Sequence, residues 1–242
     1  MARARGRFIT LEGGEGAGKS TQARLLAEAL RARGCEVVVT REPGGSPKAE
    51  KIREAILSGL IAPMGPKAEA MMFAAARIDH LDQTIRPALA RGAWVVCDRF
   101  SDSTRAYQGA LGAVEPDFLR ALERIAVGPT KPDLTIMVDV PAPTGLARAR
   151  ARASGAPDRF EAEGLAFHES LRRAFLDIAE GEPQRCAIVD GAREEQAVAA
   201  EIWRAVEARL SPPKVAARRG ETRTRRGSGA RPPKSQPRKA DA

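Results

Sequence analysis

The sequence predicts an α/β domain with a five-stranded, mostly parallel sheet and helices on both faces. Over the first 210 residues, short runs rich in β-branched residues alternate with longer amphipathic segments. The short runs are almost continuously apolar, which is typical of strands covered on both faces. A glycine-rich loop also joins the first run to the first amphipathic segment. We therefore expect one doubly wound domain, with ligands at the carboxyl ends of the strands.

The elements follow from these runs in order. The predicted strands lie at 7–13, 36–40, 93–98, 133–140 and 185–190. The predicted helices lie at 19–33, 47–59, 66–91, 103–111, 115–127, 143–153, 161–180 and 193–209. Gly34 and Gly92 each follow a predicted helix, where a left-handed glycine commonly ends the helical backbone.

Composition narrows the class of protein. A chain of 242 residues can bury one sizeable core, and no apolar run approaches the roughly 18 to 20 residues that cross a bilayer. The basic N-terminus lacks the apolar stretch of a secretory signal, and the three cysteines are widely spaced without a CxxC pair. We expect a cytoplasmic protein that does not enter a membrane.

The net charge of +9 is concentrated at the C-terminus. Ten of the 40 Lys and Arg residues and two of the 31 Asp and Glu residues lie in 211–242, which leaves 30 and 29 in the first 210. The segment 211–242 is also poor in large apolar residues, so a disordered basic tail is expected after a folded domain at 1–210. Nucleic acid is not expected to bind the nearly neutral core, while weak binding by the tail is left open.

The loop after the first strand has the pattern G-x-x-x-x-G-K-S, between an apolar run and a helical pattern. Backbone N–H groups of such a loop surround phosphate oxygens at the start of a helix. Lys19 is expected to reach the β- and γ-phosphates of ATP, and the Ser20 hydroxyl to bind Mg²⁺. The residues assigned to the ATP phosphates are Gly13, Gly14, Glu15, Gly16, Ala17, Gly18, Lys19, Ser20 and Thr21.

Glu15 is unusual in this loop, because a carboxylate repels phosphate. Two interpretations remain open. Either its side chain points into solvent, or it faces a second substrate as a hydroxyl acceptor or a partner of Mg²⁺.

Further candidates follow the third strand. Asp98 stands at the end of that strand, where a carboxylate beside a phosphate loop can reach Mg²⁺. Arg99 follows at the same crevice, where a guanidinium can bind a phosphate with two hydrogen bonds. An ordinary Asp–Arg surface pair is the alternative.

Two helical segments carry weaker signals. Arg148 and Arg152 share a helix face in a predicted lid at about 146–161, which would bring an arginine to the transferring phosphoryl group. A solvated basic face is the alternative. Phe73 and Arg77 also lie four residues apart, an arrangement that could stack on a base and bond its edge, although Phe73 alone would be read as a core residue.

Together these motifs resemble the bacterial thymidylate kinases, over roughly residues 6 to 210. The resemblance rests on FITLEGGEGAGKSTQ, TREPGGSPKAEKIRE, MMFAAAR, DRFSDSTRAYQG, PDLTIMVDV and GLARARARASGAPDRFE. It implies a P-loop NTPase fold of the nucleoside monophosphate kinase kind, and transfer of the γ-phosphoryl group of ATP to dTMP. It also implies Mg²⁺ as cofactor and a homodimer.

The resemblance implies roles for individual residues. Phe73 stacks on thymine and Arg77 bonds its edge, while Arg99 holds the acceptor phosphate with Arg41 nearby. Glu15 contacts the sugar 3′-hydroxyl or a magnesium-bound water. The nucleoside pocket is lined by Thr104, Tyr107 and Gln108, of which Tyr107 disfavours a 2′-hydroxyl. For the lid arginine, Arg152 is the first choice and Arg148 the second.

The chain departs from the family pattern in two places. Phe100 stands where a tyrosine or histidine usually follows Asp-Arg, and the basic tail has no counterpart. The alternatives for function are a kinase for another nucleoside monophosphate and, less favoured, a P-loop ATPase stimulated by nucleic acid. The neutral core argues against the second.

Overall fold

The computed structural model describes residues 6–152 and 159–213 of the chain. Its sheet contains five strands, and every neighbouring pair is parallel, so the sheet is parallel throughout rather than mostly parallel. The strand order is β2-β3-β1-β4-β5. The bounds are β1 Phe8–Glu12, β2 Val37–Arg41, β3 Trp94–Asp98, β4 Leu134–Asp139 and β5 Cys186–Asp190.

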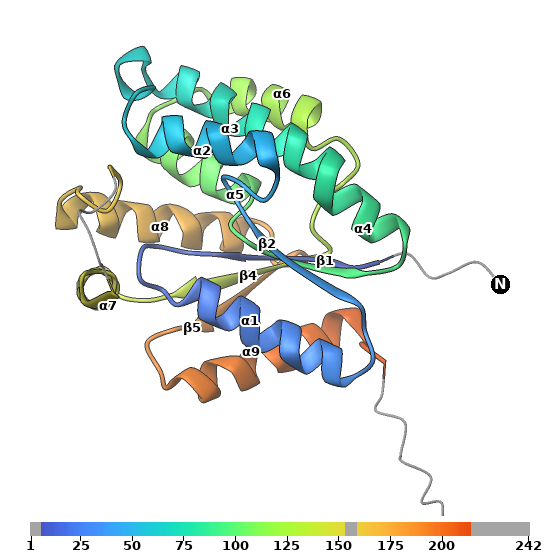
Figure 1. Ribbon diagram of the computed structural model, residues 1–242. Coiled ribbons are helices and arrows are strands. Elements are labelled where there is room, and N and C mark those ends of the chain that lie inside the picture. Colours follow the sequence, from blue (N-terminus) through green and yellow to red (C-terminus); the bar gives the residue numbers. More distant parts are fainter. Residues whose placement is uncertain (1–5, 153–158, 214–242) are drawn as a thin grey trace, which may run out of the picture.

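Helices cover both faces of the sheet, as predicted (Figure 1). One face packs against α1 (Lys19–Ala32) and α9 (Glu195–Leu210). The other face is covered by α4 (Arg86–Ala90) and α8 (Leu165–Gly181). A further layer outside that face contains α2 (Pro47–Leu57), α3 (Pro66–His80) and α6 (Pro116–Ala126).

The burial pattern explains why the central strands β1, β3 and β4 are largely apolar, since nearly all of their residues are buried. The edge strands β2 and β5 are apolar as well but only partly buried, so the expected cover on both faces holds for the central strands alone. Alternate residues of β1 point to opposite faces, so Ile9 and Leu11 join the core beneath α1 and α9, whereas Phe8 joins the core beneath α4. Full burial of one such side chain contributes about 1.5–3 kcal/mol. Glu12, at the end of β1, is a charged exception, because it is a carboxylate with no exposed surface.

Helix boundaries differ from the predicted ones at three places. The predicted helix 66–91 is continuous but contains a wider π-helical turn, η2 (Leu81–Ile85), just before Pro87, which lacks the N–H that an α-helix needs there. The predicted helix 103–111 begins earlier, as α5 (Ser101–Thr104), and continues as the π-helical η3 (Arg105–Leu111). The predicted helix 161–180 begins later, as α8. A short 3-10 helix, η1 (Ala62–Met64), was not predicted.

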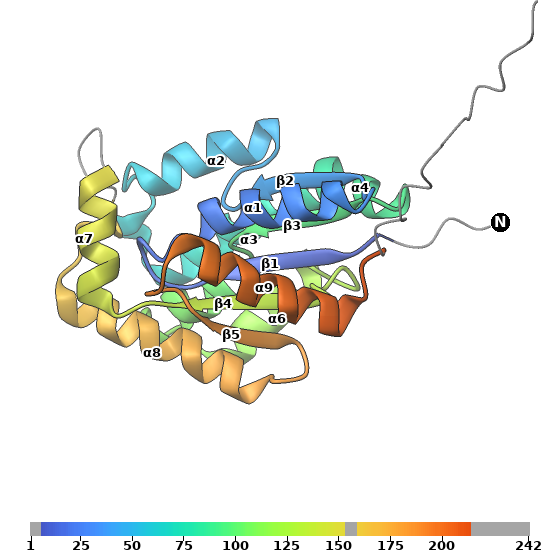
Figure 2. The same cartoon turned by 90° about the horizontal axis from the view of Figure 1, so that it is seen from below.

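The parallel arrangement places the carboxyl ends of all five strands at one edge. β1 leads there into the loop 13–18, and its Leu11 lies in register with Asp98 of β3. β2 and β3 lie on one side of β1, and after β3 the chain crosses to the other side, where β4 and β5 lie. This reversal of strand order is the switch point where ligands bind in such sheets. α7 (Ala142–Arg152) lies at the same edge in both views (Figures 1 and 2).

Parts of the sequence predictions lie outside the described residues. The middle of the lid, 153–158, and most of the expected tail, 214–242, are among them. No helix in the described ranges has the length and apolar character that a membrane-spanning segment requires.

Candidate active site

A cavity of about 300 Å³ opens at the carboxyl edge of the sheet. It brings together residues from five separate stretches of the chain. Of the residues proposed from sequence, its walls include Glu15, Gly16, Ala17, Gly18, Lys19, Ser20, Arg41, Phe73, Arg77, Asp98, Arg99, Thr104, Tyr107, Gln108 and Arg152. Four others lie elsewhere: Gly13 and Gly14 line a smaller hollow beside β4, and Thr21 and Arg148 line neither.

The phosphate loop holds its lysine inside the loop. Lys19 Nζ donates to the carbonyl oxygens of Gly13 at 3.0 Å and Gly14 at 2.7 Å. Burial, together with the nearby charge of Arg99, lowers the pKa of Lys19 to about 8. A bound polyphosphate would raise that pKa again, because an anion favours the charged ammonium.

Ser20 and Asp98 meet at the start of α1. The Ser20 hydroxyl donates to a carboxylate oxygen of Asp98 across the floor of the cavity. Both are hard oxygen donors beside the phosphate loop, and Mg²⁺ prefers one or two such ligands together with substrate phosphates. These two side chains therefore fit a magnesium site of the kind proposed from the sequence.

Glu15 does not point into solvent. Its Oε1 accepts a hydrogen bond from Arg99 at 2.6 Å and another from the Tyr107 hydroxyl at 2.6 Å. Burial alone raises the pKa of Glu15, but the charges of Arg99 and Lys19 outweigh burial and hold the pKa at about 2. The loop carboxylate is thus ionised and joins the phosphate loop to the segment after β3.

Arg99 lies between the phosphate loop and the rest of the cavity. Its NH1 donates to the carbonyl oxygen of Gly13 at 3.0 Å and to the Ser103 hydroxyl at 3.2 Å. Burial disfavours its charge, but the carboxylate of Glu15 raises its pKa well above the usual range. A permanent cation is therefore fixed beside the phosphate loop.

α3 supplies the far wall of the cavity through Phe73 and Arg77, four residues apart. Arg77 is almost completely buried, and its Nε donates to Glu42 at 2.7 Å while its NH2 donates to Thr104 at 3.2 Å. Its guanidinium carbon also lies 5.1 Å from the centre of the Phe100 ring. Phe100 thus presents an aromatic face to Arg77 at the position where the family usually has a polar ring.

Gln108, a candidate for the nucleoside pocket, and Arg41, a candidate beside the acceptor phosphate, both bond acidic neighbours. Gln108 Nε2 donates to Glu69 at 3.5 Å, and Glu69 also pairs with Arg159 from the end of the predicted lid. Arg41 is half exposed and bonds Glu50 at 3.1 Å.

The two lid arginines have different surroundings. Arg152, at the end of α7, lines the cavity. Arg148 instead donates to the carbonyl oxygens of Gly191 at 2.7 Å and Ala192 at 3.2 Å, in the loop after β5. The structure therefore brings Arg152 and not Arg148 to the cavity. A shared helix face did not place both there, because the loop after β5 binds the guanidinium of Arg148 through the carbonyl oxygens of Gly191 and Ala192.

α7 rests directly on the phosphate loop. A Cβ atom added to Gly16 would lie 1.9 Å from the carbonyl oxygen of Gly145, and one added to Gly145 would lie 2.4 Å from the carbonyl oxygen of Glu15. Gly16 also has a φ of 65°, in the region that favours glycine. Only two glycines allow the two backbones to approach this closely.

Sequence reasoning missed several residues of this site. Arg53 lines the cavity from α2, and a single arginine on an amphipathic helix gave no signal for it. Glu42 belongs to the TREPGG motif, but no role was given to it. Glu12 could have been found, since it is an acid at the end of a strand otherwise predicted to be buried on both faces.

The fold and this site define a P-loop phosphotransferase of the nucleoside monophosphate kinase kind. One cavity at the edge of a parallel sheet is lined both by a phosphate loop, after the central strand, and by an arginine after the neighbouring strand.

Comparisons with known proteins define the family. Residues 11–202 match the family described as thymidylate kinase. The chain is 58% identical over 218 residues to the thymidylate kinase of Rhodopseudomonas palustris strain BisB18, covering 89% of this chain and 95% of that one. It is 58% identical over 206 residues to the thymidylate kinase of Nitrobacter winogradskyi, covering 85% and 90%. The crystal structure of thymidylate kinase from Ehrlichia chaffeensis is 30% identical and superposes with a TM-score of 0.69, covering 84% and 99%.

The chain belongs to the thymidylate kinase family. It is a nucleoside monophosphate kinase that transfers a phosphoryl group from ATP to dTMP, which gives dTDP for dTTP synthesis.

Proposed function

We propose that the phosphate loop 13–21 binds ATP, and that dTMP binds between α3 and the segment 99–108 of the same cavity. One observation carries this division of the cavity. Lys19, on the ATP side, and Arg99, on the dTMP side, both donate to the carbonyl oxygen of Gly13. The two cations thus meet at one point of the loop, where the donor and acceptor phosphates would also meet.

The base is recognised by Phe73 and Arg77. A half-buried phenylalanine offers a face for stacking, and a guanidinium offers only donors. Arg77 donates from Nε to Glu42 and from NH2 to Thr104, whereas NH1 donates to none of the described residues and is assigned to the ligand. A donor suits the O4 carbonyl of thymine and disfavours cytosine, which carries an amino group at that position. Tyr107 and Gln108 complete the pocket beside the sugar.

The phosphoryl transfer needs no strong base, because an oxygen of the acceptor phosphate is itself the nucleophile. That oxygen attacks the γ-phosphorus of ATP, and the bond from the γ-phosphorus to the bridging oxygen of ADP breaks. Arg99, with Arg41 nearby, holds the acceptor phosphate, while Lys19 neutralises charge that develops on the transferred group. Arg152 adds a further positive charge from the lid. Arg148, the second choice for that role, ties α7 to the loop after β5 instead.

Mg²⁺ is the proposed cofactor, and Ser20 and Asp98 are the residues that would hold it. When bound, it neutralises phosphate charge and orients the γ-phosphoryl group. Glu15 is proposed to contact either the sugar 3′-hydroxyl or a magnesium-bound water. Both of its recorded bonds end on Oε1, and within the described residues Oε2 has no hydrogen-bond partner.

Coupled release of ADP with a panel of monophosphates tests the proposal. We expect a strong preference for dTMP over dCMP and AMP, and the Arg77→Met variant to lose most of it. A wild-type enzyme without preference would mean that the acceptor is wrongly assigned. Hydrolysis of ATP that needs added DNA or RNA would instead favour the nucleic-acid-stimulated ATPase.

Three broader proposals accompany this function. The chain is proposed to be cytoplasmic, in keeping with three free cysteines. The protein is proposed to act as a homodimer through α3. Met71 and Ile78 of this helix lie seven residues apart and are 49% and 38% exposed. Light scattering measures the molar mass in solution and so tests the homodimer. The domain 1–210 is proposed to carry all of the activity, and 211–242 to be a disordered basic tail that binds nucleic acid weakly or not at all.

A further inference from the structure

The segment 99–103, which follows β3, has a backbone that needs outside support. Arg99 has a φ of 68°, in the left-handed region that non-glycine residues rarely adopt. Such a conformation costs of order 1–3 kcal/mol and persists only where the surroundings fix it. The backbone N–H of Arg99 donates a hydrogen bond to the carbonyl oxygen of Leu11 at 2.9 Å, but that hydrogen bond alone does not orient the residues that follow.

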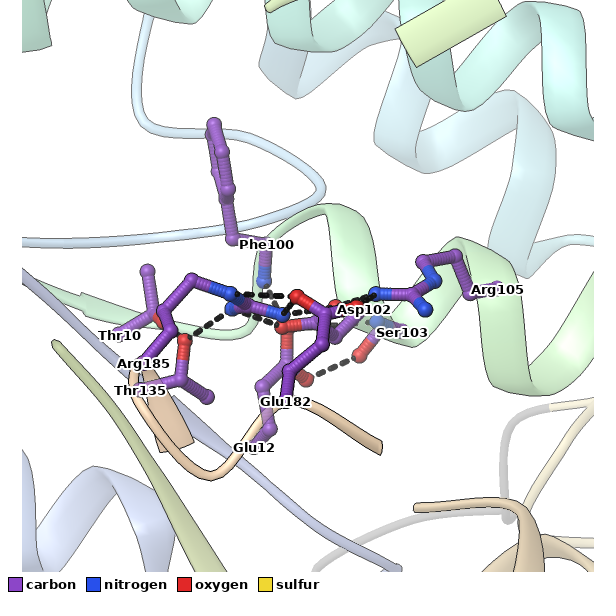
Figure 3. A network of polar contacts seen from close by, with 9 residues as sticks. All are labelled: Thr10, Glu12, Phe100, Asp102, Ser103, Arg105, Thr135, Glu182 and Arg185. Atoms are coloured by element: carbon purple, nitrogen blue, oxygen red, sulfur yellow. Dashed lines mark hydrogen bonds and ion pairs between the residues drawn. The ribbon is translucent and has the colours of Figure 1, made fainter. Parts of the chain in front are cut away.

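Glu12 holds the next part of this segment from inside the protein. Its Oε1 accepts the backbone N–H groups of Phe100 at 2.7 Å and Ser103 at 3.3 Å, and its Oε2 accepts the Ser103 hydroxyl at 2.6 Å (Figure 3). The carboxylate therefore caps the first turn of α5, although it comes from a different strand. Glu12 also directly precedes the phosphate loop, so one residue joins the loop to this segment.

Ser103 passes this restraint on to Arg99. Its hydroxyl donates to Glu12 and accepts the NH1 group of Arg99 at 3.2 Å. The guanidinium of Arg99 is thereby oriented from its backbone side and from its tip. Glu12 itself does not line the cavity, so it acts on a ligand only through these neighbours.

A second anchor grips the same segment from the opposite side. Arg185, just before β5, donates NH1 to Asp102 at 2.7 Å and NH2 to Asp102 at 3.1 Å (Figure 3). Asp102 is nearly completely buried. Arg185 is fixed in turn by Thr135 of β4 at 2.7 Å and by Glu182 at 2.8 Å. Arg185 thus reaches the segment from beside β4 and β5, on the other side of β1 from β3.

We propose that Glu12 and Arg185 are positioning residues, which hold the segment 99–103 between them so that Arg99 faces the acceptor phosphate. The inference rests on the proposed role of Arg99. A buried carboxylate without a function is costly, because burial and the charge of Asp102 both disfavour its ionised form. An apolar residue at the end of β1 would avoid this cost, but it could not accept the N–H groups of Phe100 and Ser103.

The test compares the Michaelis constants for the two substrates. In Glu12→Gln the amide oxygen can still accept N–H groups, but an NH₂ group replaces the acceptor for Ser103. Arg185→Lys keeps the charge but cannot make both bonds to Asp102. We expect both variants to raise the KM for dTMP about 10- to 100-fold, since small displacements of binding groups have effects of that size. The KM for ATP should change less than about 2-fold.

A matched control uses an arginine on the same side of the sheet. Arg173 of α8 pairs with Asp177 at 2.6 Å, and its side chain is 63% exposed. The Arg173→Lys variant should leave both constants unchanged. Thermal unfolding of each variant, with and without dTMP, separates loss of positioning from loss of folding: we expect the increase in Tm on adding dTMP to shrink in both positioning variants.

Three outcomes would overturn the inference. They are equal changes in the two Michaelis constants, a fall in Tm without any effect on dTMP binding, and no effect at all. If a variant is too unstable to assay, Ser103→Ala measures the same connection to Arg99 with a smaller change. A wild-type enzyme that shows no preference for dTMP would refute the proposed function instead, so the two failures are distinguishable.

Discussion

Glu12 should make the stability of this protein depend on pH in a way that one substitution removes. Burial and the charge of Asp102 raise the pKa of Glu12 in the folded protein from 4.5 to about 7. Between these two values the folded chain keeps a proton that the unfolded chain has lost. The contribution of Glu12 to stability is therefore complete below pH 4.5 and falls as the pH rises through 7.

The size of the effect follows from the difference in pKa. Each unit corresponds to about 1.4 kcal/mol, so the free energy of unfolding should fall by about 3 kcal/mol in total because of Glu12. Most of that fall lies between pH 5 and 8. Glu12→Gln has no proton to lose there, and titrating groups remote from Glu12 cancel in the comparison. Lys19, whose pKa is lowered to about 8 by burial and raised in part by the charge of Glu12, contributes mainly above pH 7.

Urea unfolding at pH 5, 6, 7 and 8 measures the difference between the two proteins. The free energy of unfolding of the wild type, minus that of Glu12→Gln, should decrease from pH 5 to pH 7 and level off towards pH 8, above the folded pKa of Glu12. Parallel curves would refute the reasoning, because they would mean that Glu12 is already ionised in the folded protein at pH 5. A difference that increases with pH would also refute it, since stabilising charges around Glu12 would then outweigh burial.

Three further predictions concern the cavity. Lys19→Met should lower kcat about 10²- to 10³-fold, which is the range for removal of one charge-stabilising group. Calorimetry should find dTMP binding nearly unchanged. A normal kcat would remove Lys19 from the mechanism. Tyr107→Phe removes a hydroxyl that donates to Glu15 at 2.6 Å. In steady-state kinetics kcat/KM for dTMP should fall about 10- to 100-fold, as expected for the loss of a hydrogen bond to a charged group. An unchanged kcat/KM would contradict this prediction. Gly16→Ala places a Cβ atom 1.9 Å from the carbonyl oxygen of Gly145, so it should lower both Tm and kcat. The control variant Gly181→Ala, whose Cβ atom would meet no atom within 4 Å, should leave both unchanged.

The positions of the strands could be predicted because they depend on local signals. Each apolar run became a strand, and the G-x-x-x-x-G-K-S pattern placed the phosphate loop after β1. Phe73, Arg77 and Arg99 reached one cavity because parallel strands end at one edge and α3 packs beside it. The comparisons confirmed the resemblance to thymidylate kinases that these motifs carried.

Long-range contacts could not be predicted in this way. α5 begins at Ser101, two residues before the predicted start, because its cap is Glu12, which lies 91 positions before Ser103 in the sequence. Arg148 and Arg152 look equivalent on one helix, but the sheet order brings the loop after β5 against Arg148 alone. The partners of Glu15 likewise come from more than 80 residues away. Local patterns contain no information on any of these contacts.

The carbonyl oxygen of Gly13, which accepts hydrogen bonds from both Lys19 and Arg99, has a consequence for accuracy. Errors in the placement of two reactants add up when each is located by a different mobile part of an enzyme. Here a single backbone oxygen, directly after β1, fixes the positions of both cations. Every side chain of β1 is buried. With the proposed roles of Lys19 and Arg99, movement of α2 at the rim of the cavity can therefore change how often the reactants are enclosed without moving this shared point.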